Sequence, residues 1–387
     1  MAATAELATA FQKPRLRSLL EHFATVNDSR EAAKVRFPLP EVLLLVVSAS
    51  VCSCDDYDEI VEWGEVHLDF LRSFSEFHFG IPGADWLRVL MNRIDPALFQ
   101  ACFTDWATAL RPDAADLIAI DGKTSRRSHD RKRSQKPLHL VSAWASTQQL
   151  VLAQEAVDDK ENECGAIPDV LDRLNLQGAL VSIDAIACNP AIATAITDRG
   201  GNYLLAVKAN QPTLHEEIAT AFADPTLVQS AETTEVDKGH GRIETRRAVV
   251  SHSADWLLSD RRYPGEPRFP GLAAIGMVEA TVEKAAGVSI ERRYYISSAP
   301  LTPERLAEAV RSHWGIENSL HWVLDVVFKE DQSRLRRGHG ARNMAVVRHF
   351  AINLVRIARG KRSIKTMRKL AGWDTSQLRR ILLPPPR

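Results

Sequence analysis

The chain has 387 residues, enough for two or three domains, and its 45% hydrophobic and 25% charged residues are typical of a soluble globular protein. Its five scattered cysteines argue against a disulfide framework, and its longest apolar run, residues 42–52, is too short to span a bilayer. No signal pattern opens the chain, so we expect a cytoplasmic protein without a membrane partner.

The net charge is zero, but residues 331–387 hold 15 Lys and Arg and 2 acidic residues. Such a basic segment on an otherwise acidic protein favours a polyanion partner, foremost nucleic acid. A solvated helix surface is the alternative.

Residues 1–112 are predicted to form an all-helical domain, because apolar residues recur there at helical spacing. Pro38 and Pro40 open the apolar run, and Asp95 is the predicted N-cap of a later helix. No helix-turn-helix signature is clear. The domain either binds DNA or a partner protein, or packs on the next domain as an adaptor.

From residue 116 the pattern changes to three consecutive strands, followed by alternating helices and strands. This order predicts an α/β fold of the ribonuclease H-like class, a mixed sheet flanked by helices. The strands are expected at residues 117–121, 138–144, 149–157, 180–184 and 203–208, and the helices at 163–175, 189–199 and 213–223. The remaining units are the first part of this ribonuclease H-like core at 113–229, a β-rich insertion at 230–300 with strands at 246–251, 273–282 and 289–297, the second part of the core at 301–360, and a basic C-terminal tail at 361–387.

Two aspartates each end a short apolar run, Asp121 in Ile-Ala-Ile-Asp-Gly-Lys-Thr and Asp184 in Val-Ser-Ile-Asp-Ala. Neighbouring strands of one sheet would bring the two carboxylates within reach of one cation, which would offset their repulsion. A strand-end aspartate also caps turns without further function. The Gly-Lys-Thr triplet does not make a phosphate loop, because Leu117 occupies the position where that motif needs glycine.

Glu317 is the third acidic candidate, on a helix whose apolar stripe passes through Trp314 and Leu320. Its three-residue spacing from both predicts that it points toward the sheet, where an acid is costly unless it is paired or metal-bound. Asp325, Glu330 and Asp331 are rival candidates. Together the acids suggest a site for a hard cation such as Mg²⁺.

Basic and aromatic residues near these acids are candidates for contacts to DNA. A basic loop follows the first acidic strand, Lys208 ends another strand, and Arg242 lies in a glycine-flexed β turn. Trp314 is a candidate for stacking on an unpaired base, or else a core residue. The full set is Lys123, Arg126, Arg127, Arg131, Lys132, Arg133, Lys208, Arg242, His313 and Trp314.

At these residues the chain resembles the DDE-type insertion-sequence transposases, in the subgroup of the H-repeat-associated proteins. The resemblance rests most firmly on the string from His313 to Asp325, His-Trp-Gly-Ile-Glu-Asn-Ser-Leu-His-Trp-Val-Leu-Asp, and covers nearly the whole chain. Related transposases have Tyr, Arg and Lys where this chain has Val310, His313 and Leu324.

The resemblance implies that Asp121, Asp184 and Glu317 are catalytic residues holding two Mg²⁺ or Mn²⁺ ions. The expected activity is cleavage of double-stranded DNA at element ends and strand transfer into target DNA, by a homodimer or larger assembly. The alternatives are a stand-alone metal nuclease with the same core and a non-catalytic, DNA-binding transposase remnant.

Overall fold

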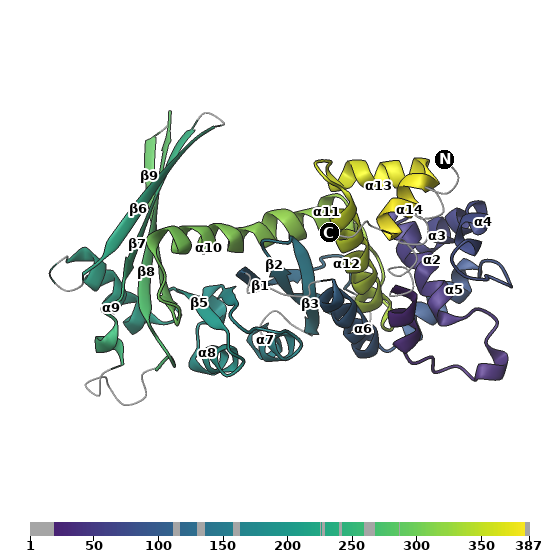
Figure 1. The fold of residues 1–387 in the computed structure, drawn as a ribbon, viewed down its shortest axis with the longest axis horizontal. Coiled ribbons are helices and arrows are strands. Elements are labelled where there is room, and N and C mark those ends of the chain that lie inside the picture. The colour runs from purple at the N-terminus through teal and green to yellow at the C-terminus, as the bar shows by residue number, and fades with distance from the viewer. Residues whose placement is uncertain are drawn as a thin grey trace, which may run out of the picture.

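The computed structural model describes residues 19–110, 117–129, 136–157, 163–224, 226, 229–239, 242–258, 268–285 and 287–383. The molecule is elongated, with a β-rich arm at one end and a helical body at the other (Figure 1). Helix α10 (Pro303–Gly315) runs from the arm toward the body and continues into the turn η6 (Ile316–His321) and helix α11 (Trp322–Val326). Across the described residues no helix combines the length and apolar character that crossing a membrane requires.

One nine-stranded sheet runs through the molecule in the order β3-β2-β1-β4-β5-β9-β8-β7-β6. Its first five strands confirm the expected ribonuclease H-like arrangement, since β1 is antiparallel to β2 and parallel to β4, and β4 is parallel to β5. The strands are β1 (Leu117–Thr124), β2 (His139–Ala145), β3 (Leu150–Val157), β4 (Leu180–Ile183), β5 (Asn202–Val207), β6 (Ala231–Gly239), β7 (Arg242–Ser251), β8 (Ala274–Lys284) and β9 (Gly287–Ser297).

The two faces of the sheet are covered by different helices. On β1, Ile118 and Ile120 belong to the core formed with α7 (Glu163–Asp172), α8 (Pro190–Thr197) and α9 (Pro212–Ala223). Leu117 points the other way and shares a core with Leu306 of α10. Because successive side chains of a strand alternate between faces, Asp121 lies on the α10 side.

The β-rich insertion extends the central sheet and does not form a separate layer, because β9 pairs with β5. Sequence patterning predicted three of its strands and missed β6. Strand β6 is almost wholly exposed at the edge of the sheet, so it lacks the apolar alternation that identifies a half-buried strand. Its pairing with β7 holds it in place.

The helical body combines both ends of the chain in one core. Phe350, at the centre of α12, packs against Phe23, Phe99, Phe103 and Trp106 of the N-terminal segment. Residues 361–387, expected to be a tail, instead contain two helices, α13 and α14. The remaining elements are η1 (Ala32–Lys34), α2 (Leu39–Val51), α3 (Tyr57–Val66), α4 (Leu68–Arg72), α5 (Ala84–Arg93), α6 (Pro96–Ala109), η4 (Ala185–Ala187), η5 (Asp255–Leu257), η7 (Glu330–Gln332), α12 (Gly340–Ala358), α13 (Ile364–Trp373) and α14 (Thr375–Leu382).

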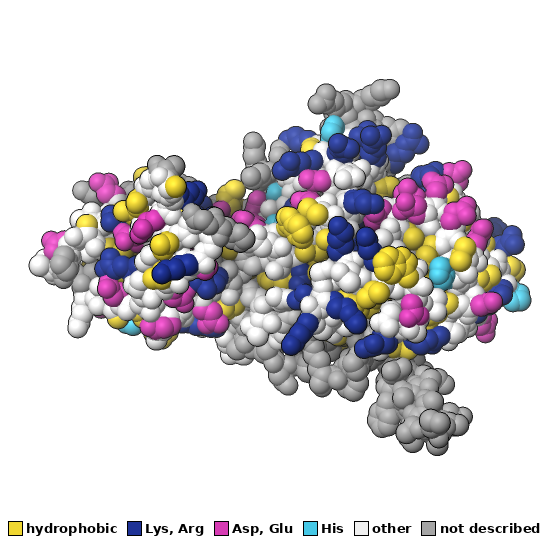
Figure 2. Space-filling view, turned by 90° about the horizontal axis from the view of Figure 1, so that it is seen from above, with side chains coloured by type: hydrophobic (Ala, Val, Ile, Leu, Met, Phe, Trp, Pro, Cys, Tyr) yellow, Lys and Arg dark blue, Asp and Glu magenta, His cyan; other side chains and the backbone are white. Residues whose placement is uncertain are grey.

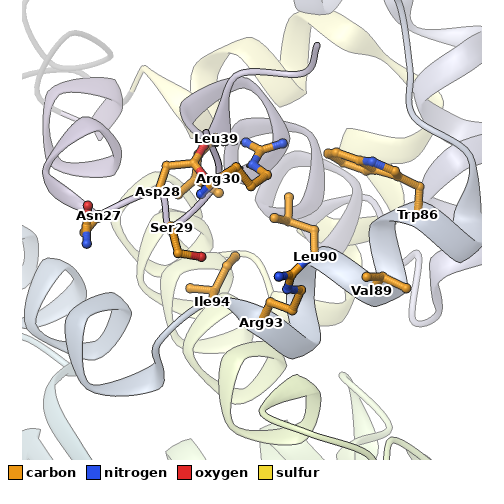
Figure 3. A pocket seen from close by; sticks show the side chains of 10 residues that line it. All are labelled: Asn27, Asp28, Ser29, Arg30, Leu39, Trp86, Val89, Leu90, Arg93 and Ile94. Carbon is orange, nitrogen blue, oxygen red and sulfur yellow. Dashed lines mark hydrogen bonds and ion pairs between the residues drawn. The ribbon is translucent and has the colours of Figure 1, made fainter. Parts of the chain in front are cut away.

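A hollow of about 60 Å³ lies on the N-terminal part of this body, between the loop at residues 27–30 and helix α5 (Figure 3). At its rim the Arg30 guanidinium pairs with Asp28 at 2.5 Å and lies 5.4 Å from the ring centre of Trp86. The guanidinium is thus used to join the loop to α5.

Candidate active site

Strand pairing brings the two predicted aspartates side by side. Ile120 of β1 is in register with Ile183 of β4, so Asp121 and Asp184 are the next residues of two adjacent parallel strands. Adjacent strands lie about 4.8 Å apart. The two apolar runs predicted this arrangement only on the condition that their strands are neighbours in one sheet.

The carboxyl group of Asp121 has a raised pKa. Burial is the main cause that raises its pKa to about 7; a hydrogen bond from the Gly122 N–H lowers it, and the carboxylates of Glu163, Glu317 and Asp184 add to the rise. A carboxyl group in this state favours a cation beside it, because a cation offsets both the lost hydration and the repulsion.

Asp184 behaves differently because it already has a cationic partner. The Lys208 ammonium donates to Asp184 Oδ1 at 3.0 Å. Burial opposes ionisation of Asp184, but the N–H of Ala185 and the Lys208 ammonium outweigh it and hold the pKa of Asp184 below its usual value. Lys208 was predicted to contact DNA phosphate; in the structure its ammonium lies beside a candidate metal ligand.

Glu317 lies in η6, a π-helical turn between α10 and α11. Its predicted position on the buried stripe is wrong, since Glu317 is exposed whereas Ile316 and Leu320 are buried. The wider π turn changes the angular spacing, so three-residue steps no longer follow one face of the helix. Glu317 is still close enough to Asp121 to affect its pKa. π-Helical turns occur frequently at functional sites.

His321 is a neighbour of the site that the sequence analysis missed. Its Nδ1 lies 3.5 Å from Asp121 Oδ2, and its Nε2 is buried without a hydrogen-bond partner. Burial is the main cause that lowers the pKa of His321 to about 3, so the ring is neutral. The sequence could have indicated His321, because it follows Glu317 by four residues, one helical turn, within the string from His313 to Asp325.

Lys123 was expected to contact phosphate, but its side chain is only 8% exposed and is held by acidic side chains. Its ammonium lies 2.6 Å from Asp325 Oδ1 and 2.8 Å from Glu330 Oε2. Burial opposes the charge, but Glu330 and Asp325 outweigh it and raise the pKa of Lys123. These two rival acids pair with the Lys123 ammonium, and the pairs join β1 to α11 and η7.

A buried pair supports β1 from the opposite face of the sheet. His139 Nε2 lies 3.2 Å from Glu163 Oε2, and His139 Nδ1 lies 2.8 Å from the Thr124 hydroxyl. A Cβ on Gly122 would lie 2.5 Å from Glu163 Cδ and 2.6 Å from His139 Nε2. The glycine of Asp-Gly-Lys therefore makes room for this pair. No sequence motif marked Glu163.

The other predicted DNA contacts lie in several places. Arg126 and Arg127 are exposed on the loop after β1, whereas Arg242 lies at the far end of the arm. His313 Nδ1 lies 3.1 Å from the Ser182 hydroxyl. Arg131, Lys132 and Arg133 lie outside the described residues.

Trp314 is 43% exposed and lies under the Arg293 guanidinium, 4.4 Å from its ring centre. The core alternative for Trp314 is therefore wrong. Both residues line a hollow of about 60 Å³ that also touches Asp184, and a larger groove of about 420 Å³ between α10 and the arm.

No three His, Cys, Asp or Glu side chains within the described part of the chain are close enough together, as they stand, to hold a metal ion. The donor chemistry nevertheless fits a hard divalent cation, because Asp121, Asp184 and Glu317 are all carboxylates and their charges interact.

Comparison with known proteins identifies the family of the chain. Residues 104–354 match the family model described as "Transposase DDE domain", and residues 20–107 match the model described as "DDE_Tnp_1-associated". The chain belongs to the DDE transposase family. Members of this family catalyse metal-dependent DNA cleavage and strand transfer.

The transposase is 37% identical over 347 residues to the H repeat-associated putative transposase YhhI of Escherichia coli (strain K12), which covers 88% of this chain and 90% of the relative. It is 36% identical over 377 residues to the putative transposase YncI of Escherichia coli O157:H7, with 95% of each chain covered. It also aligns with a cryo-EM structure of the piggyBac transposase synaptic complex with hairpin DNA, at 11% identity and a TM-score of 0.43, over 97% of this chain and 81% of that chain.

Proposed function

We propose that this transposase cuts DNA at the ends of its mobile element and joins the freed 3′ ends to target DNA, with Asp121, Asp184 and Glu317 as catalytic metal ligands. The observation that carries the proposal is the pairing of β1 with β4, which sets Asp121 beside Asp184 under the helix that bears Glu317. The pKa of Asp121, raised to about 7, adds support, because a buried carboxyl among other acids favours a bound cation.

Two Mg²⁺ or Mn²⁺ ions held by these three carboxylates would activate water or a 3′-hydroxyl and stabilise the leaving oxygen. The surrounding side chains of the protein position these carboxylates. His321 lies 3.5 Å from Asp121 on one side, and the Lys208 ammonium pairs with the Asp184 carboxylate until a metal ion takes its place. Such phosphoryl transfer depends mainly on positioning and charge neutralisation, so no covalent enzyme intermediate is required.

The DNA contacts we propose are those whose side chains are accessible. Arg126 is 83% exposed, and Trp314 lines both the hollow that touches Asp184 and the larger groove between α10 and the arm. The exposed Arg127, Lys208 and Arg242 and the partly buried His313 complete the set, whereas the buried Lys123 is left out. Cleavage of two element ends in one reaction favours a homodimer or larger assembly acting on double-stranded DNA in the cytoplasm.

The proposal is tested with Asp121→Asn and Asp184→Asn in a gel assay that follows labelled element-end DNA in Mg²⁺. Both substitutions keep the size of the side chain but remove a charged metal ligand, so cleavage and strand transfer should fall to background while end binding persists. The matched control is Asp224→Asn, since Asp224 is exposed and accepts hydrogen bonds from the N–H and hydroxyl of the nearby Thr226. Retained strand transfer in Asp121→Asn would falsify the assignment.

The same assay separates the proposed activity from its alternatives. Joining of a pre-cut 3′ end to a second duplex identifies a transposase, whereas cutting without joining identifies a nuclease. Salt-sensitive DNA binding with no metal-dependent nicking identifies a non-catalytic remnant.

A further inference from the structure

Helix α13 has one buried face and one cationic face. Ile364, Met367, Arg368 and Ala371 are buried against the helical body. On the opposite side Lys365, Lys369 and Trp373 follow one another at four-residue steps and are exposed, and Trp373 is 76% exposed. Two further exposed cations stand in the turn before the helix. We call this set the α13 surface: Lys361, Arg362, Lys365, Lys369 and Trp373.

The positive charge of the α13 surface is not neutralised by the protein. Residues 332–373 contain no Asp or Glu, and the carboxylate of Asp374, the next residue, accepts hydrogen bonds from Ser376 at the start of α14. Among the described residues, none of the four side-chain cations of the α13 surface forms an ion pair with a carboxylate. Exposed arginines of the β-rich arm do form such pairs, for example Arg247 with Glu232 and Arg292 with Glu279. An unneutralised row of cations on a folded helix fits an anionic partner.

Arg368 ties α13 to the end of the helix that carries Glu317. Its Nη1 donates to the Val327 carbonyl and its Nη2 donates to the Ser50 carbonyl at 2.8 Å. The guanidinium also lies 3.9 Å from the ring centre of Phe328. The α13 surface is therefore rigidly placed beside the C-terminal end of α11.

The stretch between Glu317 and α13 is also exposed. On α11, Trp322 is 55% and Val326 is 53% exposed. Nine residues of helix cover about 14 Å, so Glu317 and the end of α11 lie less than half a turn of duplex DNA apart. Figure 1 shows α11 ending below α13, and Lys and Arg gather over this side of the helical body in Figure 2.

We propose that the α13 surface binds the sugar–phosphate backbone of the duplex whose strand enters the active site, a proposal that rests on the proposed function. The helix is about 15 Å long, and the same length of duplex carries on the order of nine phosphate charges on its two strands, of which one side faces the protein. Lysine ammonium groups bind phosphates as point charges without requiring a base sequence, so this contact positions the DNA and does not read it. The indole of Trp373 covers apolar sugar at the end of the row.

The alternative occupant is a second copy of the chain, whose helix α3 exposes Asp58, Glu59, Glu62 and Glu65. Duplex DNA is favoured because the α13 surface adjoins the helix that bears Glu317. The experiment therefore measures both DNA binding and self-association.

The test compares the wild-type chain with the quadruple variant K361A/R362A/K365A/K369A. The matched control is K34A/R72A/K238A/K284A, which removes the same charge from exposed sites elsewhere. Each protein is titrated with labelled duplex at several salt concentrations. We expect the quadruple variant to bind about 100-fold more weakly at 0.1 M salt, and its slope of log K against log salt to be lower by about three to four. The control should keep the wild-type slope to within one.

Trp373→Ala provides a second measurement that does not depend on charge. It should weaken binding several-fold while leaving the salt slope unchanged, because the lost contact is neutral. Thermal melting followed by circular dichroism checks that each variant is folded.

The inference is overturned if the quadruple variant binds DNA with the affinity and salt slope of the control. It is also overturned if that variant loses only concentration-dependent self-association, measured by sedimentation, because the occupant would then be a second copy. The proposed function is tested separately. If the wild type cleaves DNA and Asp121→Asn does not, that function is supported whatever the α13 variants do; if both cleave DNA, it fails.

Discussion

Gly122 separates the candidate active site from the buried His139–Glu163 pair on the other face of the sheet. Asp121, one residue earlier, faces the helix that carries Glu317, whereas Gly122 faces His139 and Glu163. Because side chains of a β-strand alternate between its faces, Asp121, a candidate metal ligand, faces one side of the sheet, and Gly122 faces the buried pair on the other side. The glycine serves packing, because any side chain there would displace the pair.

Gly122→Ala should destabilise the protein by about 1–3 kcal/mol, because the new Cβ forces Glu163 and His139 to move. The measurement is the free energy of unfolding in urea. Gly165→Ala is the matched control, since a Cβ there meets nothing within 4 Å and alanine favours the helix. Equal stability of Gly122→Ala and wild type would show that the pair does not require the glycine.

At the scale of elements, a buried ion-pair cluster joins η7 to β1. Glu330 is 1% exposed and pairs with Lys123 at 2.8 Å and with Arg348 of α12 at 3.5 Å. Burial opposes ionisation of Glu330, but Lys123 and Arg348 outweigh it and lower its pKa from 4.5 to about 2. The cluster holds α11 and α12 at fixed positions relative to the strand that carries Asp121.

Glu330→Gln should lower the free energy of unfolding at pH 7 by about 3 kcal/mol, since a buried charged partner of Lys123 is lost. The lowered pKa means that the ionised carboxylate stabilises the wild type fully above pH 4.5 and progressively less between pH 4.5 and about 2. The stability difference between variant and wild type should therefore shrink over this range in urea titrations.

The exposed Glu308, which pairs with Arg305, provides the control. Glu308→Gln should change stability by less than about 0.5 kcal/mol at any pH. A Glu330→Gln difference that stays constant from pH 7 to pH 3 would contradict the ion-pair account.

At the scale of the whole molecule, the two ends of the chain share one core. Helix α12 is buried among the N-terminal helices, where Asn343 donates to the Met91 carbonyl at 2.8 Å. It also contacts the central sheet, where Asn353 exchanges hydrogen bonds with the backbone of Val151 at 2.9 and 2.8 Å. The helical N-terminal segment thus packs on the catalytic core through α12, as the adaptor alternative expected.

A fragment of residues 1–112 should therefore not fold alone, because it lacks the apolar face that α12 and α14 provide. Circular dichroism should show no cooperative thermal transition for the fragment, while the full chain melts cooperatively. In the full chain, the amides of α2 and α12 should have similar protection from hydrogen exchange. Independent two-state melting of the fragment would contradict a shared core.

The sequence by itself determined the ribonuclease H-like succession of strands and helices and the place of Asp121 and Asp184 at the ends of two apolar runs, because apolar runs and their alternation with helices are local signals. The pairing of β1 with β4, which sets the two aspartates side by side, was decided by the tertiary structure. Tertiary structure alone decided the exposure of Glu317, the burial of Lys123, the place of Glu163, and the folding of the basic C-terminal segment into α13 and α14 against the N-terminal helices. These features depend on contacts between residues far apart in the chain, such as the 207 positions that separate Lys123 from Glu330. A local pattern cannot show which distant partner a charged side chain meets.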